Sequence, residues 1–255
     1  MDLNLHSAIA DRYKSNAQKI RVLTEEWVGI NIFCPSCGDI VSHYANNKPV
    51  ADFYCAKCKE DFELKSKKNS IGKKIVDGAY ATMIERLQSS SNPNFFFLNY
   101  DKQSLDIINF IVIPKHFFIP EIIEKRKPLS STAKRAGWIG CNILLDTIPQ
   151  SGKIFYIKDK KQESKDKVLE TWHKTSFLKE STNLDTKGWL LDIISCIEKL
   201  NKDRFTLQDL YSFEPYLRVK HPNNNNIQAK IRQQLQILRD KNYLIFESRG
   251  KYRLK

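Results

Sequence analysis

No uncharged apolar run in this chain approaches the roughly 18 residues that mark a membrane-spanning helix. The longest strongly apolar stretch, Ile107 to Pro114, has the length of a buried strand. The N-terminus, Met1 to His6, also lacks the basic segment and apolar core of a secretory signal. These two absences disfavour a membrane protein and a secreted one, and we expect a soluble, cytoplasmic protein.

Acidic residues are in the minority. The 29 Asp and Glu residues face 42 Lys and Arg residues, so the formal net charge is +13. Residues 182–255 contain 14 basic and 8 acidic residues, a net of +6, which leaves +7 for residues 1–181. A field of this sign favours a polyanionic partner, and both halves can face the same nucleic acid.

Cysteine is also scarce. We expect none of the six cysteines to form a disulfide, because a cytoplasm keeps thiols reduced. Cys141 and Cys196 stand alone among apolar residues and are predicted to be inert core residues. The other four form two C-x2-C pairs that are separated by 17 residues, namely Cys34, Cys37, Cys55 and Cys58.

This spacing is typical of a tetrahedral zinc site. Each C-x2-C pair places two thiolates on one ion, and two pairs fill its four positions. A filled shell leaves no position for water, so we expect structural Zn²⁺. The alternative is four buried or redox-active cysteines. His43 lies between the pairs and is interpreted as a surface residue.

A second pattern overlaps the first. Pro49-Val-Ala-Asp52 is followed after ten residues by Glu63-Leu64-Lys65, which fits the nuclease signature P-D…(D/E)-x-K. Because side chains alternate along a strand, Glu63 and Lys65 share one face, while Leu64 and its neighbour Phe62 face the core. Asp52 reaches the same place if the intervening residues form a hairpin, which the second cysteine pair would hold.

These residues suit phosphodiester hydrolysis. Asp52 and Glu63, with the Leu64 carbonyl, are the hard oxygen donors that Mg²⁺ prefers. The cation would activate water and stabilise charge on phosphorus. Lys65 would position or deprotonate that water, or neutralise the transition state. The alternative is a solvated strand face with an ordinary ion pair. Glu25 on the first predicted helix is a further candidate for a metal contact.

The order of the predicted elements favours an α/β core with a mixed sheet. Apolar periodicity predicts helices over residues 8–28, 75–87 and 164–178. Strands are expected over residues 50–54, 61–65, 95–100, 106–113 and 153–157, and a basic loop over residues 66–74.

Beyond a polar linker at residues 179–186 the pattern changes. We expect helices at residues 189–200 and 227–238, with a short one capped by Thr206 between them. Two strands, 243–247 and 252–254, follow and are joined by a basic turn. Three helices and a hairpin describe a winged helix. We therefore expect a PD-(D/E)XK catalytic domain with a four-cysteine zinc insertion at residues 1–181 and a winged-helix domain at residues 182–255.

Several blocks carry a resemblance over the whole length. They are PVADFYC (49–55), FELKSKK (62–68), DGAYATM (77–83), NPNFFFL (92–98), RAGWIGCN (135–142) and KIRQQLQILRDK (230–241). With them the chain resembles the methyl-directed, type IIM restriction endonucleases of the DpnI family, closely enough for a close homologue or an isoschizomer. The resemblance implies Mg²⁺-dependent cleavage of double-stranded DNA at GATC sites carrying N6-methyladenine, as defence against methylated foreign DNA.

N6-methylation places an apolar group in the major groove, where a reader needs an apolar surface beside a group that bonds N7. Trp138, with Arg135 nearby, and Trp189 are candidates for that surface, and core packing is the alternative for each tryptophan. The helix over residues 227–241 is the expected major-groove helix. Its outward residues and the basic wing are the expected DNA contacts: Gln228, Lys230, Arg232, Gln233, Gln236, Arg249 and Lys251.

Two other functions fit part of the pattern. A non-catalytic, zinc-containing winged-helix regulator would share the charge and the cysteines but would not use Asp52, Glu63 and Lys65. A structure-specific repair nuclease would cut without regard to methylation. We expect a monomer, since the sequence shows no dimerisation signature.

Overall fold

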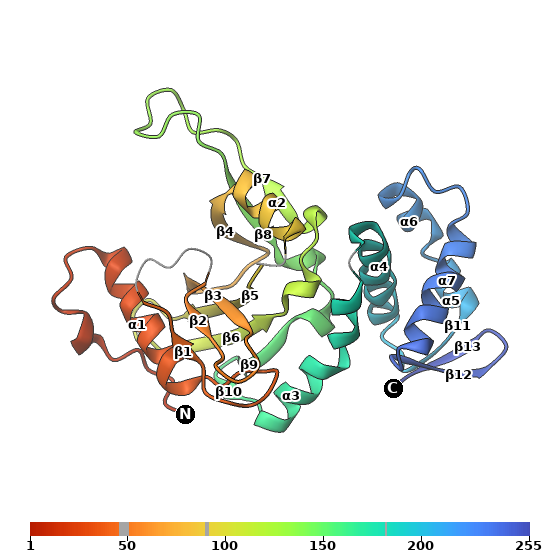
Figure 1. Ribbon diagram of the computed structural model, residues 1–255, viewed down its shortest axis with the longest axis horizontal. Helices are drawn as coiled ribbons and strands as arrows, with labels where there is room; N and C mark the ends of the chain where they lie inside the picture. Colours follow the sequence, from red (N-terminus) through yellow and green to blue (C-terminus); the bar gives the residue numbers. More distant parts are fainter. Residues whose placement is uncertain (46–50, 90–91, 182) are drawn as a thin grey trace. The chain divides into compact units, whose positions relative to one another are not determined.

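The computed structural model describes residues 1–45, 51–89, 92–181 and 183–255, which fall into two units (Figure 1). The first unit comprises residues 1–147 and 151–173, and the second comprises residues 148–150 and 174–255. The 3-10 helix η6 (Ser176–Glu180) belongs to the second unit, where the Phe177 ring lies 5.9 Å from that of Tyr243. The functional boundary at 181/182 stays a prediction, and Thr182 lies outside the described residues.

A seven-stranded mixed sheet is the centre of the first unit, as the sequence predicts for an α/β core. Its order is β1-β2-β3-β5-β6-β9-β10, in which only β3 and β5 are parallel neighbours. The strands are β1 (Ser42–His43), β2 (Phe53–Tyr54), β3 (Asp61–Lys68), β5 (Asn94–Tyr100), β6 (Ile107–Ile113), β9 (Ile154–Lys158) and β10 (Lys161–Gln162).

Aromatic side chains fill both faces of the sheet. Every residue of β5 is buried, which is why this strand reads as a continuous apolar run. On one face Phe96 stacks on Phe62 with ring centroids 4.4 Å apart. On the other face the ring of Phe95 lies 4.6 Å from that of Phe118. Each such ring contributes about 1.5–3 kcal/mol by burial, so the strands are fixed in register by packing.

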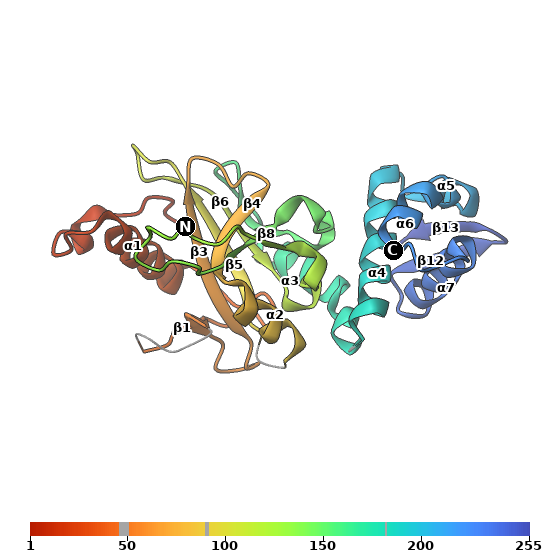
Figure 2. The ribbon, with the colours of Figure 1, turned by 90° about the horizontal axis from the view of Figure 1, so that it is seen from above.

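Two helices complete this core. α1 (Asn16–Asn31) lies alongside β3 (Figure 2) and packs Trp27 edge-on against Phe110, with 5.7 Å between centroids. α3 (Lys165–Lys174) adds Val168 and Trp172 to the same cluster. The helix predicted over residues 8–28 begins instead at Asn16, because the preceding 3-10 helix ends at Ala10 and Ser15, the residue before α1, is extended.

A small second sheet has the order β4-β8-β7, formed by β4 (Lys74–Ala79), β8 (Gly140–Leu144) and β7 (Ile123–Lys125). The expected helix over residues 75–87 is wrong in its first half, because residues 74–79 pair with β8 and only α2 (Tyr80–Gln88) is helical. Between β7 and β8, residues 126–139 form an arm that extends from the sheet (Figure 1). We call these residues the β7–β8 arm.

The basic loop is shorter than predicted. β3 continues to Lys68, which pairs with Tyr100 of β5, so only residues 69–73 connect β3 to β4. Tertiary pairing thus overrides the polar composition of this segment. The remaining 3-10 helices are η1 (Ser7–Ala10), η2 (Lys115–Phe117), η3 (Pro120–Ile122), η4 (Leu145–Thr147) and η5 (Gln150–Gly152).

The second unit has the winged-helix order. Its helices are α4 (Leu184–Leu200), α5 (Leu207–Tyr211), α6 (Glu214–Lys220) and α7 (Ile227–Asp240), and its sheet is β11-β13-β12 with β11 (Arg204–Thr206), β12 (Leu244–Ser248) and β13 (Lys251–Leu254). Thr206 caps α5 as predicted: its hydroxyl accepts a hydrogen bond from the Asp209 N–H, and the Asp209 carboxylate accepts one from the Thr206 N–H. The sequence interpretation missed α6.

Across the described ranges, every helix is too short or too polar to cross a membrane.

Candidate functional site

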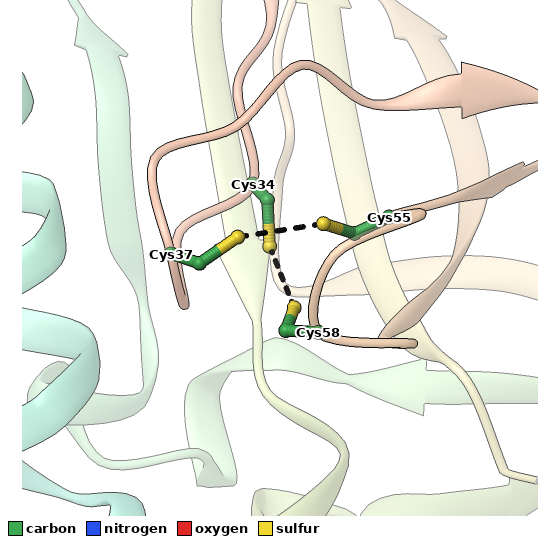
Figure 3. Close-up of side chains that lie close together, drawn as sticks. All are labelled: Cys34, Cys37, Cys55 and Cys58. Carbon is green, nitrogen blue, oxygen red and sulfur yellow. Dashed lines mark hydrogen bonds between the residues drawn. The ribbon is translucent and has the colours of Figure 1, made fainter.

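Four cysteines from two turns converge on one point (Figure 3). Their Sγ atoms all lie within 4.8 Å of one another, with Cys34 to Cys58 and Cys37 to Cys55 at 3.4 Å. Four thiolates about 2.3 Å from a zinc ion would stand about 3.8 Å apart, so the cluster has the size of a zinc tetrahedron. None of the four is in a disulfide.

Both turns have the same backbone geometry. The N–H of Gly38 donates to the Cys34 carbonyl at 2.8 Å, and the N–H of Lys59 donates to the Cys55 carbonyl at 2.9 Å. Gly38 and Lys59 both have positive φ, of 75° and 61°. This repeated turn points each pair of thiols inward, which fits the ligand set of a structural zinc site. The four cysteines can therefore hold zinc.

The remaining predictions for this segment agree with the structure. Cys141 and Cys196 are fully buried core residues. His43 is exposed, with its ring 4.4 Å from that of Phe53. Within the described ranges, the four cysteines are the only group of three or more His, Cys, Asp or Glu side chains whose ligand atoms lie this close together.

The second cysteine turn is tied to the sheet. The buried Asn94 side chain at the start of β5 donates to Glu60 Oε2 at 2.9 Å and to the Asp61 carbonyl at 2.9 Å. Its Oδ1 accepts the Lys115 N–H at 2.9 Å. Since Glu60 ends the turn and Asp61 begins β3, this network fixes where β3 leaves the cysteine cluster.

Asp52 lies at the free edge of β3. Its N–H donates to the Phe62 carbonyl at 2.9 Å, and its Oδ2 accepts the Leu64 N–H at 2.7 Å. β2 is only two residues long, and among the residues that the structure describes β3 has no partner strand on this side beyond Phe62. Because the N–H and C=O of one strand residue point to the same edge, the Leu64 carbonyl faces the open side next to Asp52.

Glu63 and Lys65 lie on the same face of β3, as the alternation of side chains along a strand predicts. Lys65 Nζ lies 2.5 Å from Glu63 Oε1 and 2.5 Å from Asp77 Oδ1, and Arg86 of α2 lies 3.4 Å from Glu63 Oε2. Burial raises the pKa of Glu63 and outweighs the attraction of Lys65. Burial opposes the charge on Lys65, yet Glu63 and Asp77 raise its pKa above the ordinary value.

One cavity of about 290 Å³, which we call the acidic cavity after Glu25, Asp52 and Glu63, brings the predicted residues together. Arg21 and Glu25 of α1 form one wall and are joined by an ion pair of 2.6 Å. Glu25, a candidate from the sequence, thus lies beside the site. The complete lining is Ala17, Arg21, Thr24, Glu25, Asp52, Glu63, Leu64, Lys65 and Ser66. Pro49, the first residue of the signature, lies outside the described residues.

Sequence reasoning missed two residues of this site. Asp77, with a side chain only 6% exposed, comes from β4 and contacts Lys65, and Arg86 comes from α2 and contacts Glu63. Nothing in the D…E-x-K spacing indicates them. The one signal that includes Asp77 is the block DGAYATM, which carries the family resemblance.

The β7–β8 arm carries the candidate aromatic reader. The guanidinium of Arg135 lies over the Trp138 ring, 4.7 Å from its centroid. Trp138 is half-buried, and its six-membered ring covers Gly140, where a Cβ would lie 2.8 Å from it. The arm and the adjoining Lys125 together contain five Lys or Arg residues and no acidic residue. Trp138 is therefore an arm residue with one face against backbone, not a core tryptophan.

The outward face of α7 is as predicted. Gln228, Arg232, Gln233 and Gln236 are exposed, while Lys230 is half-buried with its ammonium 5.8 Å from the Trp189 ring centroid. Two of these side chains bond within the unit: Gln228 to Glu214 at 2.8 Å and Arg232 to the Tyr211 hydroxyl at 2.6 Å.

The wing presents Arg249 and Lys251 on either side of the turn, and both are exposed. Trp189 is only 2% exposed and stacks on His221 with 3.6 Å between ring centroids. Its ring is therefore part of the core of the second unit and cannot contact a methyl group on DNA. For Trp189, core packing, the alternative given by the sequence, is the one that the structure shows.

Two family models match the chain. The one described as "DpnI: Dam-replacing family" matches residues 1–181, and the one described as "DpnI_C: Dam-replacing HTH domain" matches residues 185–254. The first match spans the cysteine cluster and the acidic cavity, and the second spans the winged helix.

Proposed function

Since the chain belongs to the DpnI (Dam-replacing) family of restriction endonucleases and carries that family's helix-turn-helix domain, we propose that it cleaves double-stranded DNA at GATC sites containing N6-methyladenine, with Mg²⁺ as cofactor. Its role would be type IIM restriction, a defence against methylated foreign DNA. The observation that supports catalysis most directly is the shared cavity, in which Asp52, Glu63 and Lys65 face one space.

The ligand set of this cavity fits a hard cation. Asp52, Glu63 and the Leu64 carbonyl would hold Mg²⁺, which when bound supplies an activated water and charge stabilisation at phosphorus. Asp52 is oriented by the Leu64 N–H and Glu63 by Lys65 and Arg86. The ligands are thus held by partners on rigid elements.

Lys65 lines the cavity and would act there on the reacting groups. Its ammonium is placed between Glu63 and Asp77, so it is fixed rather than free to rotate. From there the ammonium would position the attacking water or neutralise charge on the pentacovalent phosphorus. The zinc site would act at a distance, since Cys55 follows Asp52 by three residues and Cys58 precedes Glu63 by five.

DNA would be read twice. In the second unit α7 would enter the major groove with Gln228, Lys230, Arg232, Gln233 and Gln236, while Arg249 and Lys251 of the wing contact phosphates. In the first unit Trp138 and Arg135 of the β7–β8 arm would contact the methylated site. We further propose that the enzyme acts as a cytoplasmic monomer.

The decisive experiment compares two plasmids. Adenine-methylated and unmethylated copies of one plasmid are incubated with the full chain, with and without Mg²⁺. We expect cleavage of the methylated plasmid only, and only with Mg²⁺. Equal cleavage of both would identify a repair-type nuclease, and binding without any cleavage would identify a regulator. Either result would overturn the proposal.

A further inference from the structure

A larger hollow adjoins the candidate active site. It has a volume of about 700 Å³ and lies between the first turns of α1, the end of β3 and the β5–β6 turn. Ala17 and Ser66 line both this hollow and the acidic cavity, so the two are neighbours along one surface. We call the larger hollow the α1–β3 groove.

The groove is basic. Lys19, Lys68 and Lys102 line it against a single acidic residue, Asp11. Lys68 and Lys102 are exposed, and Lys19 is half-buried. No ion pair ties any of the three lysines to another residue in the described part of the chain. Three unpaired ammonium groups around one hollow favour an anionic ligand with more than one charge.

The floor of the groove is apolar. Ile20, Leu23 and Leu105 line it together with Tyr100, a residue that is 7% exposed. The first turn of α1, with Asn16 and Ala17, opens onto the same space, and helix starts carry N–H groups that favour phosphate. Phosphate-binding cations around an apolar and aromatic floor are the composition of a groove that tracks a nucleic-acid strand.

We propose that the α1–β3 groove holds the nucleotides of the cleaved strand that adjoin the scissile phosphate on one side. The lysines bind their phosphates, and the apolar floor packs against their sugars. This assignment rests on the proposed nuclease function. Ala17 and Ser66 line both hollows, so a strand bound in the groove would continue past them to Asp52 and Glu63. It extends that function, because the chemistry of cutting requires no such groove.

The test uses methylated duplexes with one site, shortened one nucleotide at a time on either side of the cut. For the wild-type chain kcat/KM should rise when the added phosphates reach the groove, on one side only. Lys68→Ala/Lys102→Ala should lose that rise and should reduce the salt slope of DNA binding by about 1.8, at ~0.9 per phosphate contact. On the shortest duplex the variant and the wild type should cut equally well.

The matched control is Lys161→Ala/Lys174→Ala. Both lysines are exposed, so the control removes the same charge as the groove variant, but Lys161 begins β10 and Lys174 ends α3, whereas Lys68 ends β3. The control should keep both the rise and the salt slope. Equal losses in both double variants would overturn the proposal, because they would report net charge only. Tight binding of a free mononucleotide with an unchanged DNA slope would also overturn it.

Failure of the nuclease function would look different. A wild-type chain that cuts nothing would remove the cleavage readout, but anisotropy of a labelled single-stranded oligonucleotide without Mg²⁺ would still compare the two double variants. Weaker binding by Lys68→Ala/Lys102→Ala alone would support a strand-binding groove, and equal binding would overturn it.

Discussion

Replacing Asp52 separates the two tasks of its carboxylate, which are to bond the Leu64 N–H and to hold a cation. Asparagine can still accept the Leu64 N–H through its side-chain oxygen but carries no charge, whereas alanine loses both. We therefore expect Asp52→Asn and Asp52→Ala to be equally deficient in cleavage but to differ in stability.

The magnitudes follow from the 2.7 Å bond between Leu64 N and Asp52 Oδ2. A bond to a charged acceptor contributes about 1.5–3 kcal/mol and one to a neutral acceptor about 0.5–1.5 kcal/mol. Asp52→Ala should thus lower the free energy of unfolding by about 2 kcal/mol and Asp52→Asn by about 1 kcal/mol. Loss of one anionic ligand should cost about 4 kcal/mol in the transition state, or about 10³-fold in rate.

Three measurements check this prediction: denaturant unfolding, cleavage of methylated DNA with Mg²⁺, and DNA binding without divalent ions. Binding should stay near the wild-type value in both variants, because Asp52 lies in the cavity of the first unit and not on the winged helix. Cleavage by Asp52→Asn within tenfold of wild type would refute the role of Asp52 as a metal ligand. Parallel loss of binding and cleavage would refute the separation of roles.

Three further predictions concern other parts of the chain. Cys55→Ser, or a zinc chelator, should release about one zinc per chain, which metal analysis would measure. Because the cysteine turns position Asp52, cleavage should be abolished, while a gel shift should show that the second unit still binds DNA. Asp77→Asn should lower kcat by about 10–100-fold with little change in KM, since it frees Lys65 from one of two carboxylates that fix it; full kcat in steady-state kinetics would contradict this. The Thr206 N–H and hydroxyl lower the pKa of Asp209 below its ordinary value of 3.8. The cap therefore stabilises the second unit above pH 3.8, and this stabilisation is lost as the pH falls through the lowered pKa. In calorimetry of the full chain, Asp209→Asn should make Tm less dependent on pH in this acid range only.

The local elements of the candidate site were predictable. Alternation placed Phe62 and Leu64 toward the core and Glu63 with Lys65 on the opposite face, and the structure confirms this. The two C-x2-C pairs predicted a cluster, and the four sulfurs meet. These predictions succeed because they depend on residues close together in the chain, whose geometry is set by strand period and turn length.

Predictions failed where distant pairing decides conformation. Residues 74–79 have helical apolar spacing, yet Ile75 and Val76 pair with β8, more than 60 residues away. The polar residues 66–68 extend β3 because they pair with β5. Propensity is a weak prior, and ladder hydrogen bonds with a buried neighbour outweigh it.

The sequence by itself determined the cysteine cluster, the strand carrying Glu63 and Lys65, the capped helix at Thr206 and the basic character of both units, since each follows from spacing or composition. Only the tertiary structure decided that Asp77 contacts Lys65 and Arg86 contacts Glu63, that Trp189 is buried, and that a basic groove adjoins the site. The reason is that contacts between residues far apart in the chain depend on sheet order and packing, and neither leaves a periodic mark in the sequence.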